Sequence, residues 1–199
     1  MSDRLKQGLV QVYTGKGKGK TTAALGLVYR AIGHEFRVCF IQFMKGNSYC
    51  GELLTSQRLK PYIDFFQFGK GNPYSGMIRS GFMENRNYGD CFFKNKNKED
   101  QKKEKEYAQM AYEFAGKVLK KEEYDIIVLD EIGIAMKYEL VTVQEVLELI
   151  KQKPEKMELV LTGRNMPLEI IEVADLVSEI KAVKHPHEQG ITARRGIEY

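Results

Sequence analysis

Residues 9–33 read LVQVYTGKGKGKTTAALGLVYRAIG and constrain the fold more strongly than any other segment. The run Leu9–Tyr13 has the length and apolar character of a short buried strand. The run Ala23–Ile32 favours a helix that ends at Gly33, and a glycine-rich segment separates the two runs. We therefore predict a strand, a tight turn and a helix in direct succession.

The turn between this strand and this helix has the features of a phosphate-binding loop. Glycines at alternate positions allow backbone N–H groups to point inward at phosphate oxygens, and the helix that begins near Thr21 adds its positive end. Lys20 is expected to reach the outer phosphates, and the Thr21 hydroxyl to ligate a Mg²⁺ ion that bridges them. A flexible lysine-rich turn is the alternative, but it would not require Gly-Lys-Thr at the start of a helix. The predicted nucleotide-binding residues, which are ATP-binding residues if the resemblance described below holds, are Gly15, Lys16, Gly17, Lys18, Gly19, Lys20, Thr21 and Thr22.

Two later segments carry polar residues at the ends of apolar runs. IIVLDE, residues 126–131, places Asp130 and Glu131 where the carboxyl end of a parallel strand would lie, so either can complete a magnesium site with Thr21. A strand that ends in Asp-Glu is weak evidence alone and gains weight from the glycine loop. Arg164, in LTGRN, follows another apolar run and is a candidate phosphate contact, although a surface arginine is the plain alternative.

The rest of the chain alternates between strand and helix patterns. Apolar positions from Tyr107 to Leu119 recur at helical spacing, and Thr142 with Glu145 forms a capping box. We therefore predict the α/β class, with a mostly parallel sheet covered by helices on both faces, in a single domain over residues 1–199. The segment 69–97 lacks either pattern and is predicted to be a lid loop. The further predicted strands are residues 38–43, 63–68, 126–129, 159–161 and 176–180.

Composition excludes several classes of protein. With 43% hydrophobic and 29% charged residues among 199, the chain is neither fibrous nor disordered. The net charge of +4 suits phosphates of any kind, and we interpret the charged run 94–106 as a solvated loop and helix start rather than a nucleic-acid patch. Three widely spaced cysteines and no apolar run near the ~20 residues of a membrane span favour a reducing, cytoplasmic location.

A set of segments in fixed order resembles the P-loop class of ATP:corrinoid adenosyltransferases. They are VYTGKGKGKTTAALGLVYRAIGH, VCFIQFMKG, DIIVLDEI, LVLTGRNMPLEIIEVADLVSEIKAVKHP and GITARRGIEY. The resemblance runs from Gly8 to Phe43 and from Lys105 to the C-terminus, and it includes a loop with Thr14 where the common form GxxxxGK(S/T) begins with glycine. It implies a P-loop NTPase, RecA-like fold.

The resemblance also implies a reaction. The 5′-deoxyadenosyl group of ATP is transferred to the Co(I) of a reduced corrinoid, tripolyphosphate is released, and the product serves adenosylcobalamin biosynthesis or salvage. Lys20 and Arg164 then act catalytically on the leaving triphosphate, and Thr21 and Glu131 match the metal ligands of the family. Asp130 joins the expected metal site only through its place at the strand end. A reduced flavoprotein as electron donor and a homodimer are implied as well, with no nucleic acid or membrane as partner.

The corrinoid side of the site is the part that matches the family least. The family places aromatic residues beneath the corrin, and Phe92 and Phe93 are the nearest match, with Tyr74 and Phe82 as rivals. The chain contains no tryptophan, and residues 72–90 have the character of an insertion. The segment KHPHEQG mimics part of a cobalt-ligating motif, but a histidine bound to cobalt would stabilise oxidation states that the reaction must leave.

Two other functions share the glycine loop. One is a RecA-like ATPase or single-stranded nucleic-acid-binding module, which the basic balance of the chain would suit. The other is a small-molecule P-loop kinase. The phosphate product separates the three, because an adenosyltransferase releases tripolyphosphate, an ATPase releases phosphate and a kinase releases ADP.

Overall fold

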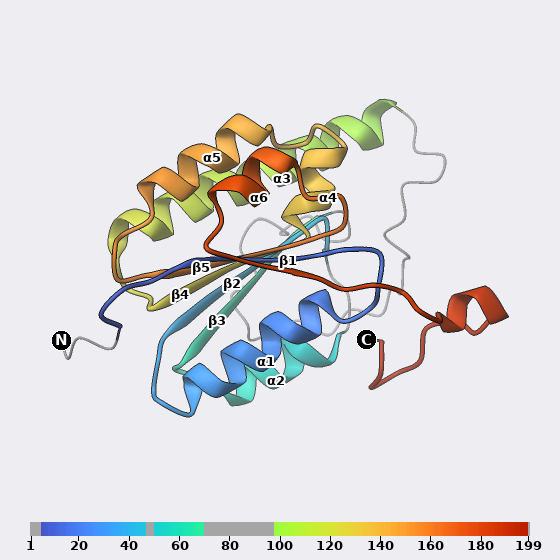
Figure 1. The fold of residues 1–199 in the computed structure, drawn as a ribbon, viewed down its shortest axis with the longest axis horizontal. Helices are drawn as coiled ribbons and strands as arrows, with labels where there is room; N and C mark the ends of the chain where they lie inside the picture. Colours follow the sequence, from blue (N-terminus) through green and yellow to red (C-terminus); the bar gives the residue numbers. More distant parts are fainter. Residues whose placement is uncertain (1–4, 47–49, 70–97, 199) are drawn as a thin grey trace.

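Six parallel strands form the centre of the molecule (Figure 1). The computed structural model describes residues 5–46, 50–69 and 98–198. The sheet order is β3-β2-β4-β5-β1-β6. This confirms the predicted α/β class and the parallel sheet. The strands are β1 (Val10–Thr14), β2 (Val38–Phe43), β3 (Ile63–Phe68), β4 (Ile126–Asp130), β5 (Glu158–Thr162) and β6 (Leu176–Glu179).

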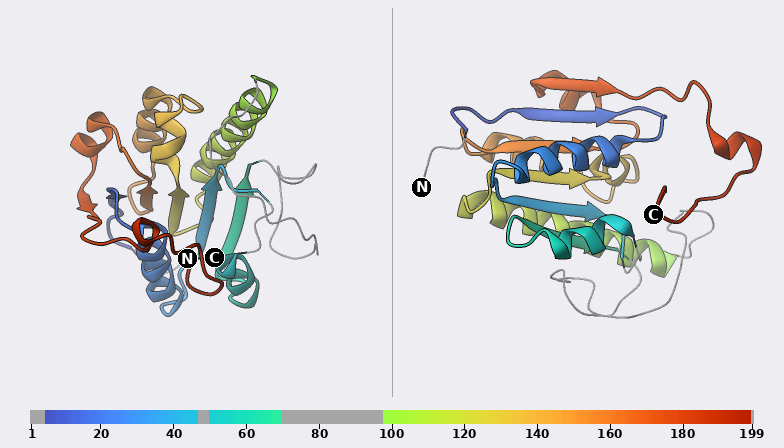
Figure 2. Two further views of the ribbon diagram at one scale, coloured as in Figure 1. Left: turned by 90° about the vertical axis from the view of Figure 1, so that its right-hand side faces the viewer. Right: turned by 90° about the horizontal axis from the view of Figure 1, so that it is seen from below.

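Helices cover both faces of this sheet. Helices α1 (Lys20–Ile32) and α2 (Gly51–Arg58) lie on one face (Figure 2). The other face carries α3 (Lys98–Lys121), α4 (Ile132–Lys137), α5 (Val143–Gln152) and α6 (Leu168–Val173). Two helices, α2 and α4, were not expected from the sequence. Among the described residues no helix combines the length and apolarity needed to cross a membrane.

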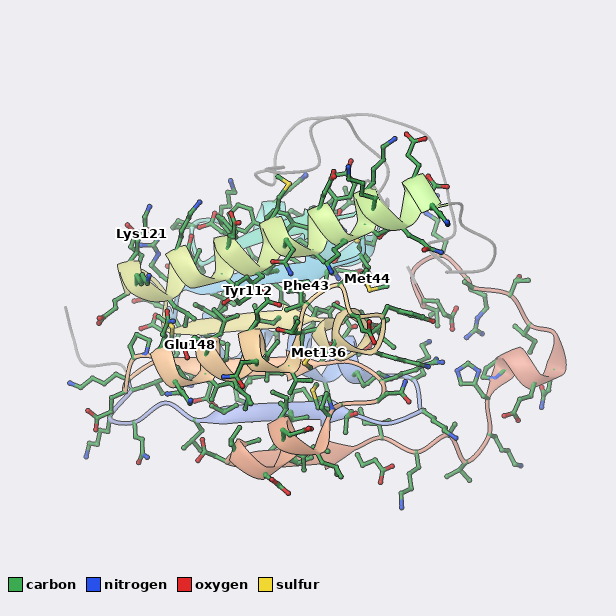
Figure 3. All side chains as sticks on the ribbon, turned by 90° about the horizontal axis from the view of Figure 1, so that it is seen from above. Phe43, Met44, Tyr112, Lys121, Met136 and Glu148 are labelled. Atoms are coloured by element: carbon green, nitrogen blue, oxygen red, sulfur yellow. The ribbon has the colours of Figure 1, made fainter. Side chains whose placement is uncertain are left out.

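Each face of the sheet has its own hydrophobic core, because alternate residues of a strand point to opposite faces. On the α1 and α2 face, Phe40 and Phe65 stack with ring centroids 4.8 Å apart, a geometry that adds about 1 kcal/mol to simple burial. On the other face, Phe43, Tyr112 and Met136 belong to the larger core beneath α3 and α5 (Figure 3). Strands buried on both sides explain the continuous apolar runs in the sequence.

Two local sequence signals, a capping box and an apolar stripe, correspond to helices of the structure. The Thr142 hydroxyl accepts from the backbone N–H of Glu145, whose carboxylate accepts from the Thr142 N–H, so the predicted capping box is confirmed. The predicted apolar stripe lies within α3, whose buried residues include Ala108, Ala111 and Leu119. The helix begins at Lys98, so most of the charged run 94–106 forms its first turns, which are largely exposed apart from the buried Glu104.

The topology gathers the predicted site at one edge of the sheet. In a parallel sheet the carboxyl ends of all strands meet at the same edge. Here β5 lies between β1 and β4, so Thr162 at the end of β5 stands between the glycine turn and the Asp130–Glu131 pair. The chain after β6 extends beyond this edge and turns back toward the start of α1 (Figure 1).

Candidate nucleotide-binding site

The glycine turn wraps around the ammonium group of Lys20. Lys20 opens α1, is 6% exposed, and its Nζ donates to the carbonyl oxygens of Gly15 at 3.0 Å and Gly17 at 2.7 Å. Burial lowers the pKa of Lys20, while the nearby Glu131 opposes that shift. The lysine is therefore held under the turn with its charge directed at the space where phosphate oxygens would lie.

The backbone of the turn requires glycine, for reasons that Gly19 and Gly17 illustrate separately. Gly19 has φ 116°, a left-handed conformation that side chains rarely adopt. At Gly17 a Cβ would lie 2.8 Å from Ile180, whose carbonyl accepts the Gly17 N–H at 2.7 Å. One amide of the turn is thus used to dock the segment after β6 rather than to face the cleft.

Asp130 connects three strands and the start of α1. Its Oδ1 accepts the hydroxyl of Thr21 at 2.8 Å and that of Thr162 at 2.7 Å, and its side chain is fully buried. Because Thr21 gives its proton to Asp130, the lone pairs of its oxygen remain available on the cleft side. Asp130 therefore orients the Thr21 hydroxyl from the side away from the cleft.

Glu131 is the carboxylate that lines the cleft. It precedes α4 with φ 63°, and its backbone N–H donates to the Thr162 hydroxyl at 3.0 Å. Burial and the neighbouring Asp130 raise its pKa, as expected for two carboxylates that share a confined space. A cation here would relieve that repulsion, which is the arrangement expected at a divalent metal site.

These residues fit Mg²⁺ when it arrives with a nucleotide. The described part of the chain contains no cluster of three His, Cys, Asp or Glu side chains that could hold a metal ion. Mg²⁺ commonly keeps several waters and takes only one or two protein ligands in addition to substrate phosphates. The Thr21 hydroxyl and the Glu131 carboxylate are placed where they could supply such ligands, and Asp130 accepts the Thr21 hydroxyl proton behind them.

Arg164 reaches the same cleft from the end of β5. Gly163 before it has φ 143° and lies so close to Gly133 of α4 that a Cβ would stand 2.6 Å from the Gly133 nitrogen. This contact fixes the point from which Arg164 extends. Its charge acts on the pKa values of both Lys20 and Glu131, so all three side chains share one electrostatic environment.

The cleft has a volume of about 810 Å³, large enough for a nucleotide with part of a second molecule. Its lining includes Gly17–Thr22 of the predicted set. Gly15 takes part through its carbonyl, and Lys16 is exposed on the turn. Apolar side chains of α1 and of the segment around α2 extend the cleft away from the turn: Leu25, Val28, Leu59 and Ile63.

Lys45 belongs to the site but was not predicted from the sequence. Its Nζ lies 3.7 Å from Asp130 Oδ2 and 3.7 Å from Glu52 Oε1. Burial would lower the pKa of Lys45, but these carboxylates outweigh it and raise the pKa. The available signal was its position two residues after a buried strand, which becomes informative only when that strand is known to lie beside β4.

The C-terminal segment also lines the cleft, through Gly196, Ile197 and Glu198. The Glu198 carboxylate accepts from Lys18 Nζ at 2.7 Å and from Arg194 at 3.1 Å. Hydrogen bonds from these two cations lower the pKa of Glu198 to about 2. The end of the chain is therefore joined to the phosphate-binding turn by an exposed ion pair.

The predicted corrinoid residues cannot be placed. Phe92 and Phe93, with their rivals Tyr74 and Phe82, lie outside the described residues, as does most of the predicted lid. His185 lines the cleft and is followed by the short 3₁₀ helix Pro186–Gln189.

Comparison with known proteins gives one consistent family. The family model described as ATP:corrinoid adenosyltransferase BtuR/CobO/CobP matches residues 6–199. A corrinoid adenosyltransferase of Sinorhizobium sp. is 34% identical over 196 residues, 98% of this chain and 81% of the relative. The corrinoid adenosyltransferase of Escherichia coli K12 and the corrinoid adenosyltransferase CobA of Salmonella typhimurium LT2 are each 31% identical over 197 residues, 98% of this chain and 87% of each relative.

Proposed function

The chain belongs to the ATP:corrinoid adenosyltransferase family, and from that premise we propose that it transfers the 5′-deoxyadenosyl group of ATP to the Co(I) of a reduced corrinoid. The Co(I) electron pair forms a bond to C5′ of the ribose, the C5′–O bond breaks, and its electrons leave with tripolyphosphate. The observation that carries the proposal is the Lys20, Thr21, Asp130 and Glu131 cluster in a cleft with room beyond a triphosphate.

The protein's task in this reaction is to bind the leaving triphosphate and orient C5′. Negative charge grows on the bridging oxygen as the C5′–O bond breaks, so fixed positive groups beside it lower the barrier. Lys20 and Arg164 are the protein cations that we assign to this role, with the amides of the turn beside them. No protein nucleophile is needed, because the cobalt is the nucleophile.

Bound Mg²⁺ would supply further positive charge to the triphosphate. Thr21 and Glu131 are proposed as its protein ligands, and Asp130 orients Thr21 through its hydrogen bond. Beside the ion, the Glu131 carboxylate would ionise more readily, because the positive charge of the ion offsets the repulsion from Asp130.

Several further features rest on the sequence patterns or on the family likeness. We propose one domain over residues 1–199 with an inserted lid at about 69–97, a cytoplasmic homodimer, and reduction of the corrinoid by a flavoprotein. Phe92 and Phe93 are proposed to approach the lower face of the corrin.

The proposal is tested by mixing the protein with ATP, Mg²⁺ and chemically reduced cobalamin under anaerobic conditions. We expect a light-sensitive cobalt–carbon product and one tripolyphosphate for each adenosyl group transferred. Release of ADP or orthophosphate without that product would overturn the proposal, and stimulation of such release by single-stranded DNA would favour the ATPase alternative.

A further inference from the structure

A row of buried polar side chains crosses the sheet beside the site. In the strand register, Gln42 of β2 is aligned with Gln67 of β3 on one side and with Asp130 of β4 on the other. All three are at most 3% exposed. Their side chains lie on the face of the sheet that α1 and α2 cover. The residues two positions earlier on the same strands, such as Phe40 and Val128, belong to the hydrophobic core of that face.

The hydrogen bonds along this row have one direction. Asp130 Oδ2 accepts from Gln42 Nε2 at 2.9 Å, and Gln42 Oε1 accepts from Gln67 Nε2 at 2.8 Å. The Gln42 nitrogen also donates to Glu52 Oε1, at the longer distance of 3.4 Å. The same Gln67 nitrogen lies 3.6 Å from the sulfur of Cys50. Because a carboxylate accepts and cannot donate when ionised, the Gln42 amide must turn its nitrogen to Asp130, and Gln67 must then turn its nitrogen to Gln42.

Packing alone does not explain two buried amides at these positions. Every neighbouring position on β2 is apolar and buried, and burying an amide in such surroundings costs free energy that its hydrogen bonds must offset. An aliphatic side chain would fill the same space without that cost. What the amides provide is a fixed orientation of the Asp130 carboxylate.

We propose that Gln42, held in place by Gln67, is a positioning residue for the nucleotide-bound metal. The amide occupies Asp130 Oδ2, so that Oδ1 stays turned toward the Thr21 hydroxyl and the Thr21 lone pairs stay turned toward the cleft. This inference rests on the proposed function, because it assigns the Thr21 oxygen to Mg²⁺. Without the amide, Lys45, 3.7 Å from the same Oδ2, becomes the strongest partner of Asp130 and draws the carboxylate away from Thr21.

The test measures ATP binding by calorimetry with and without Mg²⁺ in the full-length protein. In Gln42→Met, which keeps the length of the side chain and removes the amide, we expect the gain in ATP affinity on adding Mg²⁺ to fall about tenfold relative to wild type, the size expected for a hydrogen bond to a charged group. ATP affinity without Mg²⁺ should change much less. A merely structural role would lower both affinities together.

The chain offers a matched control. Gln11 donates to the Glu158 carboxylate at 2.6 Å on the same face, at the opposite end of β1 and β5 from the cleft. Gln11→Met removes an equivalent amide–carboxylate bond and should leave the Mg²⁺-dependent gain unchanged.

A second variant covers the case in which Gln42→Met does not fold. Gln67→Met keeps Gln42 and removes its support, so we expect a smaller loss of the Mg²⁺-dependent gain, about threefold. If either folded variant gains as much ATP affinity on adding Mg²⁺ as the wild type does, the inference is wrong and the proposed function is unaffected. A wild-type protein whose ATP affinity does not respond to Mg²⁺ overturns the proposed metal site itself, and the inference with it.

Discussion

Lys20 is the residue on which the phosphate-binding role of the turn most depends. Its ammonium group already bonds two carbonyls of the turn, so it is placed before any nucleotide arrives. We expect Lys20→Ala to lower the rate of adenosyl transfer at least a hundredfold, because a preorganised charge next to the leaving group is lost. The rate of formation of the light-sensitive product is the measurement.

The control for this variant is Lys120→Ala, at an exposed position in the last turn of α3. It removes the same charge far from the cleft and should transfer the adenosyl group at the wild-type rate. If Lys20→Ala were as active as Lys120→Ala, Lys20 would have no part in the reaction.

Cys50 shows how burial suppresses a reactive group beside the cleft. Its thiol is 4% exposed, and burial, with Glu52 nearby, raises its pKa to about 12. The thiolate is the reactive form, so the fraction of reactive Cys50 at pH 7–9 is very small. We expect iodoacetamide to leave Cys50 unmodified in the native protein across this range and to modify it in denaturant, with peptide mass spectrometry as the measurement. Rapid native labelling that increases with pH around 8.5, as for a free thiol, would contradict this.

The residues of the site that could be predicted are those in local motifs. Gly-Lys-Thr after a strand places Lys20 and Thr21 through the chemistry of one turn, and an acidic pair after β4 suggests its partners. Gln42 and Lys45 carry no such local signal. Their relation to Asp130 arises from the pairing of β2 with β4, which joins residues 88 apart in the chain.

Among the elements, the glycine turn and α1 meet at Gly19, whose left-handed backbone begins the helix. A Cβ at Gly19 would contact nothing within 4 Å, so Gly19→Ala tests backbone conformation alone. We expect it to destabilise the protein by about 1–2 kcal/mol, the cost of a left-handed alanine, and to weaken ATP binding as the turn relaxes. Urea unfolding and calorimetry measure the two effects.

Gly116 provides the comparison in a helix interior. It lies within α3, and an added Cβ would make ordinary contact with Leu149 at 3.6 Å. Gly116→Ala should therefore stabilise the protein by up to about 1 kcal/mol through helix propensity, with ATP binding unchanged. Equal effects of the two substitutions on stability would show that the conformation of Gly19 carries no strain cost for alanine.

Elements with a clear periodic or cap signal could be predicted, whereas the short helices α2 and α4 could not. The α3 stripe, the capped α5 and the strands have strong periodic or cap signals. Helix α4 spans six residues and begins after Glu131 in a left-handed conformation without a side-chain cap. Its position depends on the close contact between Gly133 and Gly163, which is a tertiary feature. The order of the strands in the sheet is likewise decided by how the helices pack. The alternation of strands and helices along the chain therefore predicted a parallel sheet but not the order of its strands.

On the scale of the whole molecule, the two ends of the chain line the same cleft. The glycine turn after β1 lines one part of it, and Gly196, Ile197 and Glu198 line another. Among the residues that the structure describes, none beyond Ala174 belongs to either core. The segment 180–198 is therefore held mainly by its contacts with the turn, among them the Ile180 backbone bonds and the Lys18–Glu198 pair.

Glu198 places a negative charge where phosphate oxygens would compete for Lys18. We expect Glu198→Gln to bind ATP about two- to fivefold more tightly at low ionic strength, because Lys18 is released and a repulsive charge is removed. The difference should shrink in 0.5 M salt, on the order of the concentration that screens exposed pairs. Thermal stability should change little, since an exposed ion pair contributes little to folding.

The matched control is Glu179→Gln, which breaks the exposed pair at 3.8 Å between Glu179, the last residue of β6, and Lys181. Glu179 does not line the cleft, so its loss changes net charge equally without freeing Lys18. Calorimetric titration of both variants at two salt concentrations separates the local effect from the effect of net charge. Weaker ATP binding in Glu198→Gln than in Glu179→Gln would mean that Glu198 orders the cleft for the nucleotide rather than competing with it.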